Sequence, residues 1–176
     1  VNMTGTFLCC QVLGGAMAQA GRGSIVNVGS IYGMLSPVQP IYAYKEKKTG
    51  TPFVKPVAYS ASKSGLYNFT RYLATYWAPK GVRVNILTPS GVRRDSQDAE
   101  FQANYCARMP IGRMAEEDEF NGAIVFLASD ASRYMTGAIS FRFGKVLVLK
   151  GSMPTTPQTY AGQRRTRAGQ VAEWDM

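Results

Sequence analysis

Residues 23–30, with the sequence Gly-Ser-Ile-Val-Asn-Val-Gly-Ser, decide the fold class of this chain. A short run rich in β-branched residues between glycines is typical of a buried strand, here residues 24–28. A second such run spans residues 82–87, and a third strand is predicted within 138–149. Because helical patterns separate these runs, the sequence predicts an α/β fold with a doubly wound parallel sheet covered by helices on both faces, in three layers.

Three helices are predicted where apolar residues recur at helical spacing. They span residues 2–20, 59–78 and 116–129. Each presents one apolar face to the sheet, and the expected inward residues are Met3, Phe7, Cys10, Gly14 and Met17 in the first helix, Leu66, Phe69, Leu73, Tyr76 and Trp77 in the second, and Phe120, Ile124 and Leu127 in the third.

The chain is expected to form one domain over residues 1–150, followed by an irregular tail over 151–176. The tail is rich in Thr, Gln, Gly and Arg and shows no period, which is typical of a segment without a packed core. Within the domain, proline, glycine and a lysine run predict a loop or lid from Pro37 to Pro56, of which residues 38–56 are interpreted as an insertion. Residues 92–112 predict a polar loop.

The composition excludes several classes of function. The chain has no histidine, and its three cysteines contain no Cys-x-x-Cys pair. These counts argue against zinc sites of the usual ligand types, against Ser-His or Cys-His nucleophiles and against a disulfide framework, so no metal is expected and a reducing, cytoplasmic compartment is the default. No apolar run reaches the roughly 18 residues that cross a membrane, and no signal-peptide pattern is present.

The net charge of +9 invites a nucleic-acid reading. The basic residues, however, form several short, separate clusters, and aromatic residues do not alternate with them as a base-stacking surface requires. We therefore expect neither a nucleic-acid partner nor a membrane.

Tyr59 and Lys63 lie four residues apart at the start of the second predicted helix, so both side chains project from one face. A nearby ammonium stabilises a phenolate and lowers the pKa of a phenol, which suits the pair to acid or base work on a carbonyl or alcohol oxygen. The spacing alone is weak, since Tyr44/Lys48 and Tyr76/Lys80 share it. The Tyr44/Lys48 pair lies in the predicted loop, and the Tyr76/Lys80 pair has Pro79 inside it. Of the three pairs, only Tyr59/Lys63 opens a helix that packs on the sheet.

Ser30 follows the strand over residues 24–28, at the carboxyl end where parallel sheets place their ligands. Its hydroxyl could hold a substrate oxygen beside the phenol. The alternative is ordinary turn chemistry, in which the hydroxyl only stabilises the local backbone. By the same logic Asn2 could be a helix N-cap.

Together these residues resemble the short-chain dehydrogenase/reductase family over roughly residues 1–140. The similar segments, in order, are Asn2-Met3-Thr4-Gly5, residues 23–30 with Ser30 at the end, Tyr59-Ser60-Ala61-Ser62-Lys63, and Val82-Arg83-Val84-Asn85 followed by Pro89-Ser90-Gly91. The resemblance implies a partial Rossmann-like fold and NAD- or NADP-dependent interconversion of a carbonyl and a secondary alcohol. It also implies a small-molecule substrate and a homo-oligomer, dimer or tetramer, in the full-length form.

The resemblance assigns roles residue by residue. Tyr59 would donate or accept the proton, Ser30 would orient the carbonyl, and Lys63 would lower the pKa of the phenol and hydrogen-bond the nicotinamide ribose. Asn2 would anchor a proton-relay water. The turn after the second strand would lie against the nicotinamide, and its residues are Pro89, Ser90, Gly91 and Val92.

The sequence also departs from the family pattern. The glycine-rich phosphate-binding turn is expected before Asn2 and is not found, so the chain resembles the C-terminal catalytic portion, truncated at its N-terminus. Ser90 stands where glycine is usual, and the segment from Phe141 to Met176 does not resemble the family. The insertion over 38–56 resembles that of sugar and sugar-nucleotide oxidoreductases. The alternative function is a truncated, non-catalytic family member that acts only through subunit association, its two long helices being the contact faces.

Overall fold

The computed structural model describes the fold of residues 1–142. Three parallel strands form one sheet in the order β1-β2-β3, with β1 over Gly23–Val28, β2 over Val82–Thr88 and β3 over Ile139–Arg142. β1 and β2 pair in register from Gly23↔Val82 to Val28↔Leu87. The parallel sheet predicted from the sequence is confirmed. The rest of the predicted third strand and the tail over 151–176 lie outside the described residues.

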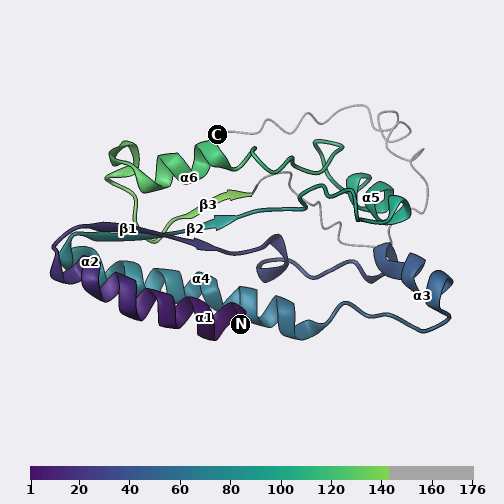
Figure 1. Cartoon of the computed structure of the whole chain (residues 1–176), viewed down its shortest axis with the longest axis horizontal. Coiled ribbons are helices and arrows are strands. Elements are labelled where there is room, and N and C mark those ends of the chain that lie inside the picture. The colour runs from purple at the N-terminus through teal and green to yellow at the C-terminus, as the bar shows by residue number, and fades with distance from the viewer. Residues whose placement is uncertain (143–176) are drawn as a thin grey trace, which may run out of the picture.

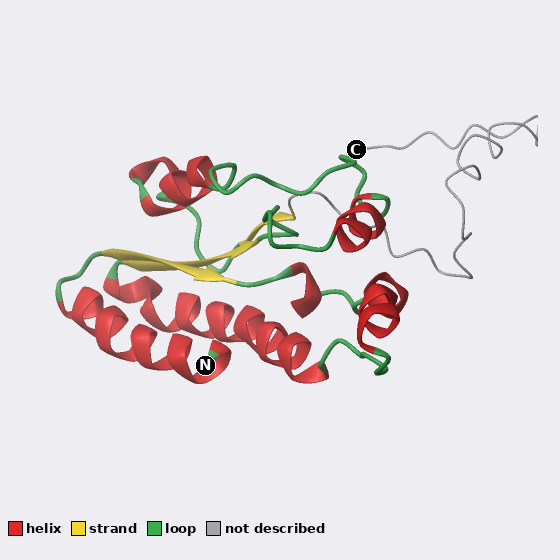
Figure 2. Ribbon diagram, turned by 45° about the vertical axis from the view of Figure 1, so that its right-hand side comes forward, coloured by secondary structure: helices red, strands yellow, loops and turns green. Residues whose placement is uncertain are grey.

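Helices cover both faces of this sheet (Figures 1 and 2). One face carries α4, Val57–Trp77, and a continuous helix made of α1, Asn2–Cys9, a π-helical turn, Cys10–Gly14, and α2, Gly15–Gln19. The other face carries α6, Asn121–Ala128. The arrangement confirms the predicted three-layer, Rossmann-like architecture.

The core lies between β2 and the helices. Val84 and Ile86 are fully buried, as are Leu66 of α4 and Leu127 of α6. Gly14 lies in the π-helical turn directly against the Trp77 ring, where any larger side chain would collide with it. This close contact packs the π-helical turn onto the C-terminal end of α4.

Three of the residues predicted to face inward do not. Phe7 is 46% exposed, Tyr76 55% and Ile124 42%. Phe7 and Tyr76 instead lie against neighbouring rings on the helix surface, Phe7 beside Phe69 and Tyr76 stacked on Tyr72. The helix predicted from residue 116 begins only at Asn121, because the preceding residues are held in turns by an Arg113–Glu119 ion pair.

The expectation of a loop over 37–56 is wrong for much of its length. A 3-10 turn spans Gln39–Tyr42 and a helix, α3, spans Ala43–Thr49. The polar segment 92–112 likewise contains α5, Ala99–Cys106, which Asp98 caps by accepting hydrogen bonds from the next backbone N–H groups. Figure 1 shows α3 and α5 side by side, beyond the carboxyl ends of β1 and β2.

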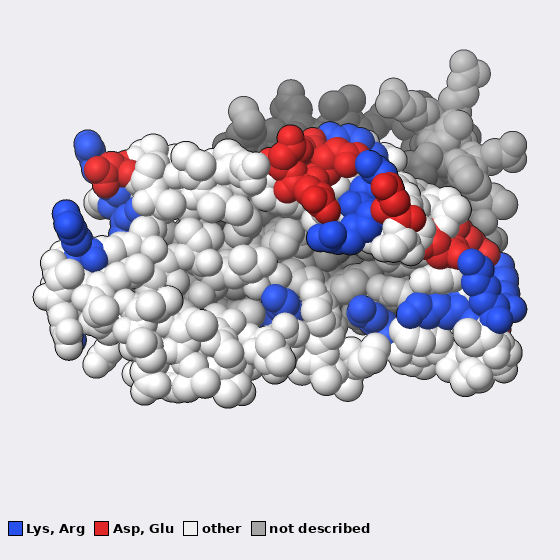
Figure 3. Space-filling view, viewed as in Figure 1, with Lys and Arg blue, Asp and Glu red and all other residues white. Residues whose placement is uncertain are grey.

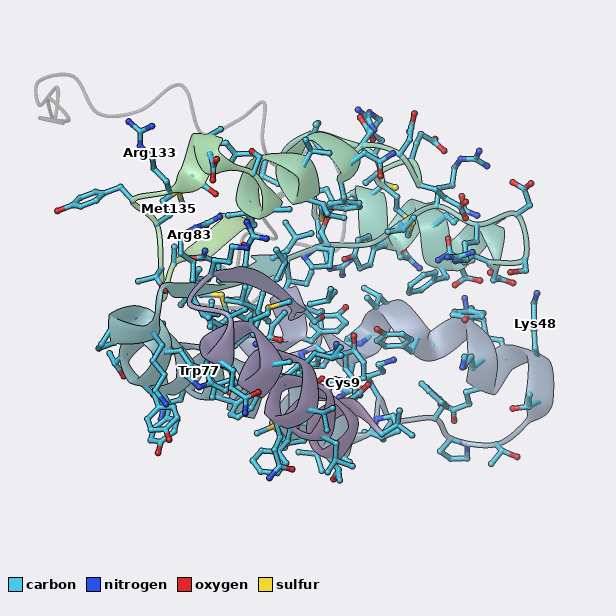
Figure 4. All side chains as sticks on the ribbon, turned by 60° about the vertical axis from the view of Figure 1, so that its left-hand side comes forward. Cys9, Lys48, Trp77, Arg83, Arg133 and Met135 are labelled. Carbon is cyan, nitrogen blue, oxygen red and sulfur yellow. The ribbon has the colours of Figure 1, made fainter. Side chains whose placement is uncertain are left out.

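The segment after α6 returns to the sheet through a 3-10 turn, Asp130–Ser132, and is fastened there by two residues of β2. The Arg83 guanidinium donates to the carbonyls of Leu127 and Ser129, both at 3.1 Å. Asn85 donates to the carbonyl of Met135 at 3.0 Å. Figure 4 shows Arg83 reaching from the sheet toward this segment, with Met135 and Arg133 beside it.

Candidate active site

Two turns meet at the carboxyl edge of the sheet, where β1 and β2 both end. The backbone N–H of Gly29 donates to Leu87 at 2.8 Å, and that of Ile31 donates to the carbonyl of Pro89 at 3.2 Å. Parallel pairing therefore continues past the strands and brings the turn with Ser30 beside the turn with Pro89. Parallel sheets bind their ligands at this edge.

Ser30 is buried and adopts an extended backbone conformation just before a short 3-10 turn, Ile31–Gly33. Its Oγ accepts a hydrogen bond of 3.2 Å from the backbone N–H of Tyr32. Within residues 1–142 this hydroxyl has no acceptor for its own proton, which could therefore be donated to a substrate oxygen. The local role in the turn, raised as the alternative, is thus present.

Tyr67, which the sequence interpretation missed, holds the backbone of Ser30. Its hydroxyl donates to the carbonyl of Ser30 at 2.7 Å and lies 3.1 Å from Oγ1 of Thr88 at the end of β2. The only sequence signal for it was its position one helical turn after Lys63, on the face toward the sheet.

Tyr59 and Lys63 lie in the first two turns of α4, which begins at Val57. Both are partly buried. The Lys63 amino group donates a hydrogen bond of 2.8 Å to the carbonyl of Val28, the last residue of β1, and burial lowers its pKa. The predicted pair thus starts a helix packed on the sheet, at the edge where Ser30 lies.

Close backbone contact brings the turn after Ser30 against α4. A Cβ built on Gly33 would lie 2.7 Å from the carbonyl carbon of Lys63, so only glycine fits.

Asn2 is the first helical residue of α1, and Val1 occupies the N-cap position. The N-cap alternative for Asn2 is therefore wrong. Its side-chain amide donates to Oγ of Ser62 at 3.3 Å, and Ser62 Oγ donates to the carbonyl of Tyr59 at 2.9 Å. Asn2 is thus linked through one serine to the turn of α4 that carries Tyr59.

The residues predicted to lie against a nicotinamide form the exit from β2. Gly91 lies against the Tyr105 ring, which a Cβ would meet at 2.6 Å, and its carbonyl accepts from the Ala115 N–H at 2.9 Å. Val92 bridges to Ala115. Ser90 is partly exposed in the same turn.

An aromatic cluster missed at the sequence level borders the site. Tyr42 donates to the Tyr32 hydroxyl at 3.2 Å, and burial raises the pKa of both phenols. Tyr105, also buried, has its pKa raised to about 12. The cluster joins α3 and α5, the two helices that the sequence interpretation treated as loop.

The fold and this edge define the class of nucleotide-binding α/β oxidoreductases. The family model described as "Enoyl-(Acyl carrier protein) reductase" matches residues 1–141. The chain belongs to the short-chain dehydrogenase/reductase family, as its motifs predicted.

Several characterised proteins are similar to this chain. Cis-4-hydroxycyclohexanecarboxylate dehydrogenase of Sinomonas cyclohexanicum is 36% identical over 79% of the chain and 51% of its own length. Galactitol 2-dehydrogenase (L-tagatose-forming) of Cereibacter sphaeroides is also 36% identical, with the same coverage. A short-chain dehydrogenase of Leptospira borgpetersenii, solved with bound NAD⁺, superposes with a TM-score of 0.69 at 36% identity over 78% of this chain and 50% of its own.

The chain spans about half the length of the relatives it matches. Other solved structures at this level of similarity were obtained with NADP. The family is thus one of NAD- or NADP-binding proteins. Among the described residues no helix is long and apolar enough to cross a membrane.

The carboxyl edge suits the nicotinamide end of such a cofactor. Val28, at the end of β1, is 51% exposed and offers an apolar surface to a flat ring. The partly buried Lys63 ammonium beside it spends one of its three donors on the Val28 carbonyl, which leaves donors for ribose hydroxyls. Lys63, Tyr59 and the turn over 89–92 are the residues that would hold the group.

Proposed function

We propose that this chain provides the proton-transfer site of an NAD- or NADP-dependent dehydrogenase that interconverts a secondary alcohol and a carbonyl compound. The observation that carries the proposal is the placement of Tyr59 and Lys63 at the start of α4, at the sheet edge where Ser30 lies. When bound, the nicotinamide supplies or accepts the hydride.

In alcohol oxidation, the Tyr59 phenolate takes the proton from the substrate hydroxyl, and in reduction the phenol returns it. Ser30 donates its free hydroxyl proton to the substrate oxygen and fixes its position. Lys63, held on the Val28 carbonyl, keeps further donors that would bind the cofactor's ribose hydroxyls. Asn2, held through Ser62, positions the turn of α4 that carries Tyr59 and anchors a water for proton release.

The substrate class we propose is a polyol or a cyclic secondary alcohol. The galactitol and hydroxycyclohexanecarboxylate dehydrogenases named above act on such alcohols. In this chain the segments 38–56 and 92–112 lie over the carboxyl edge and would line the substrate pocket, with the turn over 89–92 beneath them.

Replacement of Tyr59 with Phe tests the proposal. Two proteins serve: the 176-residue chain, and a chimera that adds the part of the Leptospira borgpetersenii dehydrogenase preceding the matched region. We expect Tyr59→Phe to lower turnover of secondary alcohols by at least about 100-fold, with the affinity for NADH nearly unchanged. Tyr72→Phe, at an exposed position of the same helix, is the matched control. Retained turnover in Tyr59→Phe would refute the assignment.

A second candidate, association without catalysis, draws on the exposed apolar side chains of the first helix, which include Leu8, Val12 and Leu13. Fluorescence titration of the purified chain with NADH and NADPH separates the two candidates. Binding near micromolar would argue against a purely associative role, and absence of binding together with self-association would favour it.

A further inference from the structure

Arg108, just after α5, is a cation without a counter-ion in the part of the chain that the structure describes. Its Nη1 donates to the carbonyl of Asn104 at 2.6 Å, whereas its Nε is buried and meets no acceptor among the described residues. A buried hydrogen-bond donor without a partner is energetically unfavourable. An unmet guanidinium donor of this kind suits an anionic ligand.

Neighbouring arginines in the same segment are all paired. Arg93 contacts Asp95 at 2.6 Å, Arg94 contacts Glu117 at 3.0 Å and Arg113 contacts Glu119 at 2.5 Å. The side chains of these three arginines are 47%, 62% and 51% exposed. Arg108 thus differs from them both in burial and in lacking a carboxylate.

Arg108 lies beside the tyrosines that border the candidate active site. Its backbone N–H donates at 3.0 Å to the carbonyl of Tyr105, which is buried in the same cluster as Ile31 and Tyr42. The next residue, Met109, packs with Ile31 and Tyr42 in the buried cluster under α3 and α5. Arg108 therefore belongs to the wall of the pocket proposed above.

Lys55 approaches the same tyrosines from the other segment. Its Nζ lies 5.0 Å from the centre of the Tyr59 ring and 5.8 Å from that of Tyr42. Within residues 1–142 it makes no ion pair, although Lys47 of α3 pairs with Glu100 of α5, and Lys48 of α3 pairs with Asp98 at the N-cap of α5. Figure 3 shows how the charges are distributed on this face. Acidic and basic side chains lie together on the upper half and at the right end. In the hollow between the two halves, basic side chains lie without acidic neighbours.

We propose that Arg108 and Lys55 recognise a carboxylate on the substrate, so that the dehydrogenase proposed above acts on a hydroxy-carboxylate or oxo-carboxylate. The inference rests on that proposed function for the identity of the pocket. Among the described residues these two cations make no ion pair, and they flank the cluster that contains Tyr42: Lys55 lies 5.8 Å from the Tyr42 ring, and Arg108 stands in the chain between Tyr105 and Met109 of that cluster. A guanidinium presents two parallel donors that match the two oxygens of a carboxylate.

The test is a binding measurement that needs neither cofactor nor turnover. Calorimetric titration of the 176-residue chain compares cis-4-hydroxycyclohexanecarboxylate with the corresponding carboxamide, which has the same ring and hydroxyl but no charge. We expect the carboxylate to bind at least about tenfold more tightly, the effect of one hydrogen bond between charged groups. Arg108→Gln should abolish this preference, Lys55→Gln should reduce it, and Arg108→Lys should keep part of it.

Arg71→Gln, on the exposed face of α4, and Lys45→Gln, whose ammonium lies over Phe53, are matched controls that should keep the full preference. Equal affinity of the wild-type chain for the two compounds, or no binding of either, would overturn the inference, as would an undiminished preference in folded Arg108→Gln. Because hydride transfer is not measured, a catalytically inactive protein that still prefers the carboxylate would contradict the proposed function and leave this inference standing.

Discussion

The buried hydroxyl of Tyr67 holds both backbone polar groups of Ser30: it donates to the Ser30 carbonyl at 2.7 Å and accepts from the Ser30 N–H at 3.3 Å. A side chain in the middle of α4 thereby fixes the turn that ends β1. Since the proposed substrate contact is the Ser30 hydroxyl, the position of that hydroxyl depends on Tyr67 although Tyr67 need not touch a substrate.

Tyr67→Phe should therefore destabilise the protein by about 1–3 kcal/mol, because two buried backbone groups lose their partner. The midpoint of urea unfolding, followed by circular dichroism, measures the effect. Tyr72→Phe removes a hydroxyl from an exposed ring of the same helix and should change stability by less than about 0.5 kcal/mol. Equal midpoints for the two variants would show that the Ser30 turn does not depend on Tyr67.

Gly33→Ala should also be destabilising, by about 1–3 kcal/mol, since the new methyl group would meet the rigid backbone of Lys63. Gly5→Ala is the control: it lies in α1 with open space around it and should stabilise the helix by up to about 1 kcal/mol. Thermal unfolding should rank the proteins Gly5→Ala, wild type, Gly33→Ala. A stable Gly33→Ala protein would mean that the turn can move away from α4.

Arg83→Met should loosen the segment that returns from α6 to β3. The guanidinium donates to three backbone carbonyls and to Oγ of Ser132, and methionine cannot replace these bonds, so we expect a loss of about 2–4 kcal/mol. Hydrogen exchange should rise first in residues 127–138. Arg71→Met, at an exposed position, should leave the exchange pattern unchanged.

Local patterns predicted the elements next to the sheet well. The strands expected at 24–28 and 82–87 are observed at Gly23–Val28 and Val82–Thr88, and the helix expected at 59–78 is observed at Val57–Trp77. These segments bury one continuous face or are buried on both sides. The spacing of their apolar residues therefore indicates which side chains face the core. The motif residues Ser30, Tyr59 and Lys63 follow from these elements because each stands at a strand end or a helix start.

The helices over the site could not be predicted in this way, because distant contacts stabilise them. α3 is short and charged, and it is held by ion pairs from Lys47 to Glu100 of α5 and from Lys48 to Asp98 at the N-cap of α5, which lie 53 and 50 positions away. Phe101 of α5 stacks on Tyr42 with ring centres 5.6 Å apart. Neither contact leaves a local period in the sequence, and the same holds for the role proposed for Arg108.

The acid stability of the chain should depend on Glu119. Arg113 donates two hydrogen bonds to this carboxylate, at 2.5 and 2.6 Å, and the Glu116 N–H donates a third, which together lower the pKa of Glu119 to about 2 from 4.5. A carboxyl with a depressed pKa in the folded state stabilises that state above its unfolded pKa, and this contribution disappears as the pH falls through the folded value. The stabilisation should thus be complete above pH 4.5 and decline toward pH 2.

Glu119→Gln removes this titration, so the difference in urea midpoint between wild type and variant should be largest near neutral pH and shrink as the pH falls from about 4.5 to about 2. Asp118→Asn, one residue earlier, is the matched control and should leave the pH dependence of the wild type in place. The ion pair is exposed, so added salt should weaken it, and a smaller difference between Glu119→Gln and wild type is expected at 1 M than at 0.1 M sodium chloride. Curves that run parallel down to pH 2 would show that the turn before α6 is held by its backbone alone and that the carboxylate of Glu119 contributes nothing to folding.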